Sequence, residues 1–159
     1  MCTYENLLND AKTMGIDVTE VNFESDAKGL CKGNKIGIRK DMSVAEKACV
    51  LAEEIAHCQT TVGNILDQGN PNNRKQETSA RKLAVDRLLD IEDLFRAANA
   101  CCSTLYEVAE YLEVTEGFLL ESIEVFKRRY GYSYTSDKKT IVFNDCGFYI
   151  IAEQKGELP

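Results

Sequence analysis

Three residues of one short segment have the types and spacing that metal-dependent hydrolysis requires. Within residues 50–57 (VLAEEIAH), two adjacent carboxylates, Glu53 and Glu54, precede His57, the one histidine of the chain. The segment differs by one residue from the pattern His-Glu-x-x-His, in which two histidines hold zinc and the glutamate acts as general base. Glu53 stands at the first ligand position, Glu54 at the position of the base, and His57 at the second ligand position.

A helix would place these side chains suitably. Positions i and i+4 lie on one helix face with Cβ atoms about 5–6 Å apart, so Glu53 and His57 can hold one ion between them. Glu54 is turned by about 100° from Glu53, which suits a base acting on a metal-bound water. The same short pattern also occurs on ordinary solvated helix faces, so a metal site needs a further donor.

A candidate further donor lies in a second predicted helix, over residues 74–89. Glu77 lies near its start, one turn before an apolar stripe at helical period that consists of Ala80, Leu83, Ala84 and Leu88. Zinc sites of the His₂Glu type take their third ligand from such a downstream helix. The predicted metal ligands are therefore Glu53, His57 and Glu77, with Glu54 as the catalytic base.

Together the two helices resemble the ImmA/IrrE family of metallopeptidases. That family has a His-Glu-x-x-His helix followed by a helix of the form Glu-x-x-Ala-x-x-Phe-Ala-x-x-Leu-Leu, whose places are filled here by Glu77, Ala80, Leu83-Ala84 and Leu88-Leu89. Residues 29–41 (GLCKGNKIGIRKD) resemble the family's hairpin before the active-site helix, which a Ser43-x-x-Glu46 capping box would open. The resemblance covers residues 1–130 and implies a zincin-like fold and a peptidase activity.

Two residues depart from the family pattern. Glu53 replaces the first histidine, and Asp90 stands where a proline follows the Leu-Leu pair. Two carboxylates and a neutral imidazole leave a divalent ion formally neutral, so the ion would acidify its bound water less than in a His₂Glu site. The harder oxygen donors also widen the choice of metal to Mn²⁺ or Fe²⁺ beside Zn²⁺, which we expect first.

The whole chain is predicted to be an α+β protein. We expect a zincin-like minimal metallopeptidase core, made of a small antiparallel sheet plus helices, then a helix-turn-helix-like helical pair and a C-terminal β-hairpin. Residues 1–100 would form the metallopeptidase-like domain, and residues 101–159 the helical pair and hairpin packed on it. The expected helices span residues 4–14, 44–60, 74–89 and 91–100, and the expected strands residues 18–23 and 29–39.

Residues 104–129 have the apolar spacing of a helix-turn-helix, with Thr115 as the expected N-cap of the second helix. A DNA-reading helix needs basic residues, because phosphate neutralisation supplies most of the affinity. This helix presents three glutamates before its first cation, Lys127. We therefore expect a structural or protein-binding helical pair and no direct contact with nucleic acid.

Composition narrows the function classes further. The chain has 159 residues, a net charge of −7 and a pI near 4.8, which disfavours nonspecific binding to nucleic acids or membrane surfaces. It has no membrane-spanning apolar run and no secretory signal, so we expect a cytoplasmic protein. The seven cysteines include no Cys-x-x-Cys pair, and all are expected to be reduced, buried thiols.

Three functions from different classes remain open. The resemblance implies an endopeptidase that cleaves a phage or mobile-element repressor of the helix-turn-helix type, with Glu54 taking a proton from a metal-bound water. Attraction between an acidic enzyme and a basic repressor would favour this pairing. The first alternative is a catalytically inactive family member that binds a repressor. The second, which the acidic helix disfavours, is a DNA-binding regulator.

Overall fold

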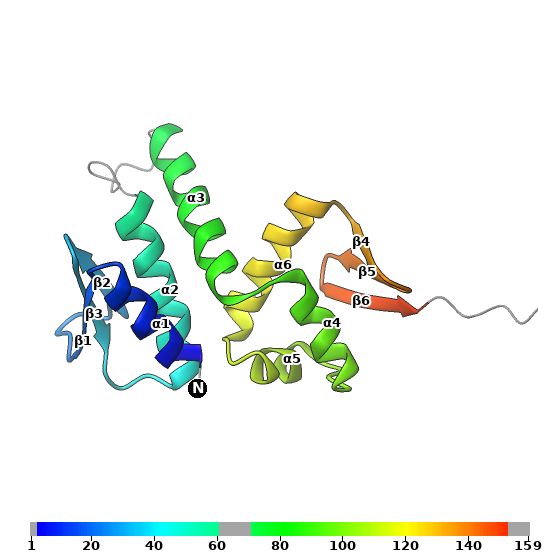
Figure 1. Ribbon diagram of the computed structural model, residues 1–159, viewed down its shortest axis with the longest axis horizontal. Helices are drawn as coiled ribbons and strands as arrows, with labels where there is room; N and C mark the ends of the chain where they lie inside the picture. Colours follow the sequence, from blue (N-terminus) through cyan, green and yellow to red (C-terminus); the bar gives the residue numbers. More distant parts are fainter. Residues whose placement is uncertain (1–2, 61–70, 153–159) are drawn as a thin grey trace, which may run out of the picture. The chain divides into compact units, whose positions relative to one another are not determined.

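The computed structural model describes residues 3–60 and 71–152, except for the side chains of residues 71–73 (Figure 1). It consists of two compact units. The first comprises Met1–Leu89 together with Glu113–Thr115, and the second comprises Asp90–Leu112 and Glu116–Pro159. The domain division that the sequence suggests at residue 100 stays a prediction. Both units combine helices with a small sheet, so the predicted α+β class is confirmed.

The first unit contains three helices and three strands within its described residues. The helices are α1 (Thr3–Thr13), α2 (Val44–Thr60) and α3 (Pro71–Leu88). The strands are β1 (Asp17–Val21), β2 (Gly29–Lys32) and β3 (Lys35–Arg39). The predicted capping box is present at the start of α2, where Glu46 donates its backbone N–H to Ser43 Oγ and accepts the backbone N–H of Ser43.

The sheet of the first unit is mixed, with the strand order β1-β3-β2. β2 and β3 form the predicted antiparallel hairpin, but β1 pairs with β3 in parallel, with Val18 opposite Ile36. The expectation of an entirely antiparallel sheet is therefore wrong for β1. Successive strands do reverse direction, but β3 inserts between β1 and β2, so the first and third strands run parallel.

Helix α2 is the central element of the first unit, and it packs against α1, α3, β2 and β3. Its buried side chains are mostly small or aliphatic: Ala48, Leu51, Ala52, Ile55 and Ala56. α3 contributes Ala80, Ala84 and Val85, all buried, and small residues on both helices let their backbones approach closely. This packing fixes α3 beside the segment of α2 that carries the predicted site.

A polar network joins three elements at another side of α2. The Tyr4 hydroxyl donates to Glu20 Oε1 at 3.1 Å, and Lys47 Nζ donates to Glu20 Oε2 at 2.9 Å. Burial, together with the nearby Glu20 carboxylate, raises the pKa of Tyr4 to about 12. The tyrosine therefore stays protonated and links α1 to β1, while the lysine links β1 to α2.

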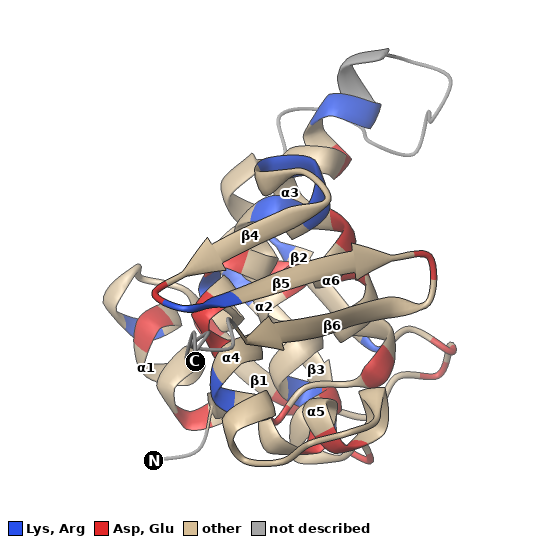
Figure 2. Cartoon of the chain, turned by 90° about the vertical axis from the view of Figure 1, so that its right-hand side faces the viewer, with Lys and Arg blue, Asp and Glu red and all other residues tan. Residues whose placement is uncertain are grey.

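The second unit contains helices α4 (Ile91–Asn99), α5 (Leu105–Tyr111) and α6 (Glu116–Tyr130). Its strands β4 (Ser133–Ser136), β5 (Lys139–Asn144) and β6 (Gly147–Ala152) form an antiparallel sheet in sequence order. Figure 2 shows this sheet face-on, with its charged residues at the turns and strand ends. The predicted C-terminal hairpin corresponds to β5 and β6, and β4 adds a third strand.

The predicted helical pair is present as α5 and α6. A capping box at Thr104 begins α5, and Glu113 adopts a left-handed backbone conformation with φ 55° in the turn that follows. The buried side chains of this unit include Leu94, Leu119, Ile123, Phe126 and Ile141. Within residues 3–60 and 71–152, no helix is long and apolar enough to cross a membrane.

Candidate functional site

A pocket of about 500 Å³ opens in the first unit, between strand β2 and helices α2 and α3. Three of the four predicted site residues line it, namely Glu54, His57 and Glu77. The rest of the lining comes from the hairpin and the end of α2: Gly29, Leu30, Cys31, Gly33 and Cys58. The structure thus brings Glu77 on α3 to the same pocket as Glu54 and His57 on α2, which are 20 or more positions earlier in the sequence.

Each of these side chains is positioned by an element whose formation the sequence explains. Glu54 and His57 are three positions apart on α2 and therefore share a helix face. Glu77 reaches the same pocket because Ala80 and Ala84 bury the next turns of α3 against the core. β2 is an edge strand of its sheet and forms the opposite wall.

Glu54 is a carboxylate of this pocket whose surroundings change its pKa. Burial raises its pKa, against the opposing effects of the His57 charge and of a hydrogen bond from the Cys31 backbone N–H. A carboxylate with a raised pKa is a stronger base than an exposed glutamate. Its position and basicity therefore suit the transfer of a proton within the pocket.

Glu53 differs from the other three predicted site residues, because it is not among the described residues that line the pocket. It lies near Cys49, one turn earlier on α2, where its negative charge adds to the burial that raises the pKa of the Cys49 thiol. Among the residues that the structure describes, no three His, Cys, Asp or Glu side chains are arranged to hold one metal ion. Glu53, His57 and Glu77 therefore stay a predicted ligand set, of which two members face one pocket.

Gly29 is a functional position that the sequence reasoning missed. A Cβ atom at this position would lie 2.6 Å from Val50 Cγ1 and 2.8 Å from Glu54 Cγ. Only glycine lets the backbone of β2 approach α2 so closely. A glycine at the start of a predicted strand beside an active-site helix is the signal that could have identified it.

We expect Gly29→Ala to destabilise the protein by about 1–3 kcal/mol, the usual cost of overpacking a filled site, and to displace Glu54. Urea denaturation of the variant measures the loss. Gly117→Ala is the matched control, because nothing lies within 4 Å of a Cβ there and an alanine favours the helix. Equal stability of Gly29→Ala and the unmodified chain would contradict the close approach of β2 to α2.

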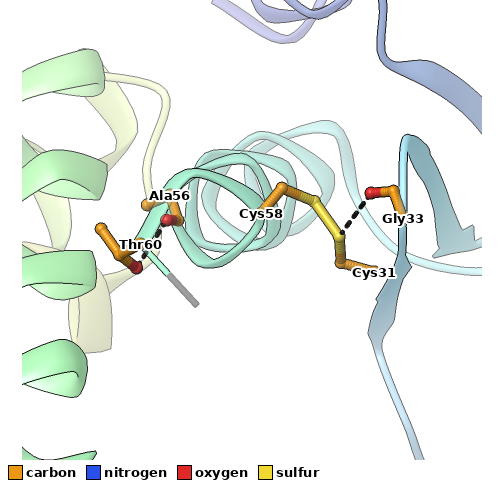
Figure 3. The surroundings of a disulfide bond; sticks show 5 residues. All are labelled: Cys31, Gly33, Ala56, Cys58 and Thr60. Atoms are coloured by element: carbon orange, nitrogen blue, oxygen red, sulfur yellow. Dashed lines mark hydrogen bonds between the residues drawn. A yellow bond between two sulfur atoms is a disulfide. The ribbon is translucent and has the colours of Figure 1, made fainter. Parts of the chain in front are cut away.

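A disulfide between Cys31 on β2 and Cys58 on α2 borders the same pocket (Figure 3). The Cα atoms are 6.3 Å apart, although the two residues are separated by 27 positions in the sequence. The prediction that all cysteines are reduced is therefore wrong for this pair. The pairing depends on β2 lying against the end of α2, a tertiary contact that cysteine spacing does not reveal.

The other described cysteines are free thiols. Cys49 is buried as expected, whereas Cys101 and Cys146 are exposed and Cys102 is half-buried, so the prediction of buried thiols is wrong for these three. Cys101 and Cys146 lie in turns of the second unit, and Cys102 lies in the loop between α4 and α5. Cys2 lies outside the described residues.

Comparison with known proteins gives one match. Residues 11–124 match the family model of the IrrE N-terminal-like domain, a peptidase family whose members are generally metal-dependent. Neither the curated proteins nor the solved structures gave a significant match. The matched segment includes β1, β2, β3, α2 and α3, and with them every residue of the pocket. Because the match covers more than half of the sequence, the chain belongs to the IrrE N-terminal-like domain family, which the resemblance of its two site helices had indicated.

Proposed function

We propose that the protein is a metal-dependent endopeptidase whose active site is the pocket between α2, α3 and β2. The observation that carries this proposal is the meeting of Glu54, His57 and Glu77 in one pocket of a peptidase-family domain. An imidazole and a carboxylate that line the same cavity can both serve as ligands of a divalent cation. His57 and Glu77 are the proposed ligands at the pocket, and Glu53 is the third one that the sequence pattern supplies.

The proposed chemistry relies on Glu54 as the base. A divalent ion, Zn²⁺ first and Mn²⁺ or Fe²⁺ as alternatives, would acidify a water molecule and polarise the scissile carbonyl. Glu54 would accept the proton of that water and donate it to the leaving amine. Burial, which raises the pKa of Glu54, helps it to hold this proton between the two steps.

An extended protein segment is the substrate form that the pocket favours. β2 is an edge strand of the described sheet, and Leu30, at the rim of the pocket, is 58% exposed. An extended segment can add to such an edge through backbone hydrogen bonds, with apolar side chains covering Leu30. We propose an accessible loop of a basic helix-turn-helix repressor, which the net charge of −7 would attract.

Metal content of the purified protein tests the proposal. Elemental mass spectrometry should find about one transition metal per chain, and Glu77→Ala should lose it, because the site would then lack a ligand. Glu121→Ala, at an exposed glutamate of α6 in the second unit, is the matched control and should keep the metal. Absence of metal from all three proteins, even after incubation with Zn²⁺ or Mn²⁺, would contradict the peptidase proposal.

One observation favours a second candidate function, a family member that binds a repressor without cleaving it. Glu53 lies outside the pocket lining, and the described residues offer no three-donor group. Under this alternative, the protein would capture a repressor that stays intact on prolonged incubation. Mass spectrometry of the captured repressor distinguishes the two functions, because the endopeptidase proposal requires new termini.

A further inference from the structure

The disulfide between Cys31 and Cys58 is placed where two thiols would serve as metal donors. Both cysteines line the pocket that contains His57 and Glu77, and Cys58 follows His57 directly on α2. Neither cysteine is fully buried, so a reductant dissolved in the solvent can reach the bond. Figure 3 shows the bond bridging strand and helix.

In the oxidised protein these two sulfurs are withheld from any ion. The sulfur atoms of a disulfide are weak ligands, whereas thiolates are among the strongest that zinc finds in proteins. Among the residues that the structure describes, no three His, Cys, Asp or Glu side chains are arranged to hold one metal ion, so the two sulfurs could join such a group only after their bond is broken. Besides the two cysteines, the pocket is lined by the imidazole of His57 and the carboxylates of Glu54 and Glu77.

We propose that Cys31 and Cys58 are a redox-controlled pair of metal ligands, which on reduction join His57 to bind Zn²⁺ in this pocket. The inference rests on the proposed function in that it uses the same pocket and the same histidine. It departs from the pattern-based ligand set, because the missing donors come from sulfur and not from Glu53. Glu77, on the same pocket, is available as the fourth ligand.

The two thiols are placed so that they can share one ion. Two thiolates on one tetrahedral zinc, each about 2.3 Å from the ion, lie about 3.8 Å apart. The Cα separation of 6.3 Å already brings the two side chains within reach of one ion. After reduction β2 stays paired with β3, where Cys31 is opposite Ile36, and Cys58 stays on α2, so both thiols remain at the pocket.

The contact of Cys31 with Gly33 changes with the redox state. Cys31 Sγ lies 3.5 Å from the Gly33 carbonyl oxygen, and in the disulfide it has no hydrogen to donate. The reduced thiol can donate a hydrogen bond there. In the absence of metal, the hairpin thus offers the thiol a partner and holds it at the rim of the pocket.

The reaction is an ordinary thiol–disulfide exchange. A dithiol reductant attacks one sulfur, the Cys31–Cys58 bond breaks, and the reductant's second thiol closes its own disulfide. The protein gains two electrons and two protons, and the reductant loses them. Binding of the divalent ion then releases the two thiol protons to solvent.

Cobalt substitution tests the proposal, because thiolate ligation to Co²⁺ gives a sulfur-to-metal charge-transfer absorption band. The protein is reduced, freed of reductant without air, and titrated with Co²⁺ beside the oxidised protein. We expect the band only in the reduced protein, and its loss in Cys31→Ser and in Cys58→Ser. Loss of a group that hydrogen-bonds to a metal ligand lowers metal affinity by about 10–100-fold, and loss of a ligand itself should lower it at least as much. Because reduction would supply two ligands, we expect Zn²⁺ affinity to rise by about 10–100-fold or more on reduction.

A control variant excludes other thiols as the source of the absorption band. In this variant serine replaces four cysteines outside the pocket: Cys2, Cys101, Cys102 and Cys146. This variant should keep the band. Circular dichroism of the reduced protein checks that it remains folded. Because the oxidised and reduced forms of the unmodified chain are compared directly, this comparison does not depend on any substitution.

The outcomes separate this inference from the proposed function. Cobalt binding without a sulfur band in the reduced protein would overturn the inference and leave a site of oxygen and nitrogen donors. A sulfur band that persists in Cys31→Ser and Cys58→Ser would also overturn it. A redox-dependent band in a protein that cleaves no peptide would support the inference and overturn the peptidase proposal.

Discussion

Replacing Glu54 by glutamine is expected to lower the rate of peptide hydrolysis by about 10²–10⁴-fold, the usual contribution of a general base. Glutamine keeps the size and shape of the side chain but accepts no proton at neutral pH. The pocket walls, including the close approach of Gly29 to this side chain, should stay unchanged. The loss should therefore appear in kcat and not in substrate binding.

The same substitution should not unfold the protein. Burial raises the folded-state pKa of Glu54 above its ordinary value of 4.5, so the folded state favours the protonated form. The stabilisation that Glu54 contributes through this shift is fully present at a pH below its ordinary pKa, and it is lost as the pH rises through the raised pKa. At neutral pH a neutral glutamine removes the cost of burying the charge, and the stability should be equal or higher.

Two measurements together check this prediction. Mass spectrometry of a diverse peptide pool identifies cleaved bonds with the unmodified protein, and the rate for one such peptide is then compared with that of Glu54→Gln. Denaturant titration of both proteins reports their stabilities. Glu24→Gln, at an exposed glutamate outside the pocket, is the matched control and should keep the full rate. A Glu54→Gln rate close to that of the control would exclude Glu54 as the base.

The helical part of the site could be predicted from the sequence because its signals are local. The spacing of Glu54 and His57 is set by one helix, and the apolar stripe that includes Ala80 and Ala84 determines which side of α3 faces the core. Glu77 then follows from its place before that stripe. These three residues do share one pocket, although their catalytic and ligand roles remain predictions.

The features that the sequence did not reveal depend on contacts between elements. The parallel pairing of β1 follows from the insertion of β3, which no alternation pattern encodes. The Cys31–Cys58 bond requires β2 to lie on the end of α2, and Gly29 allows that approach. The position of Glu53 outside the pocket lining depends on how α2 is rotated against the neighbouring elements, and the helix period alone leaves that rotation open.

Loss of the Cys31–Cys58 bond is expected to lower the free energy of unfolding by about 3.5 kcal/mol, because the bond closes a loop with a sequence separation of 27. The cross-link restricts the unfolded chain, and most of its stabilisation arises there. A loss of this size is a large fraction of the stability of an ordinary domain. It should appear both on reduction and in the Cys31→Ala, Cys58→Ala double variant.

Urea denaturation with and without a reductant measures this effect. Each single variant should lose about as much as the double variant, since either substitution removes the whole cross-link, and so the two effects should not add. Cys101→Ala and Cys146→Ala, at exposed free thiols, are matched controls. With or without the reductant, each should have the same midpoint as the unmodified protein under the same condition. A reductant that shifts the midpoint of the unmodified protein but not that of the double variant would show that this bond alone couples stability to redox state. An unmodified protein whose midpoint does not change with the reductant would contradict the prediction that this bond stabilises the fold and is lost on reduction.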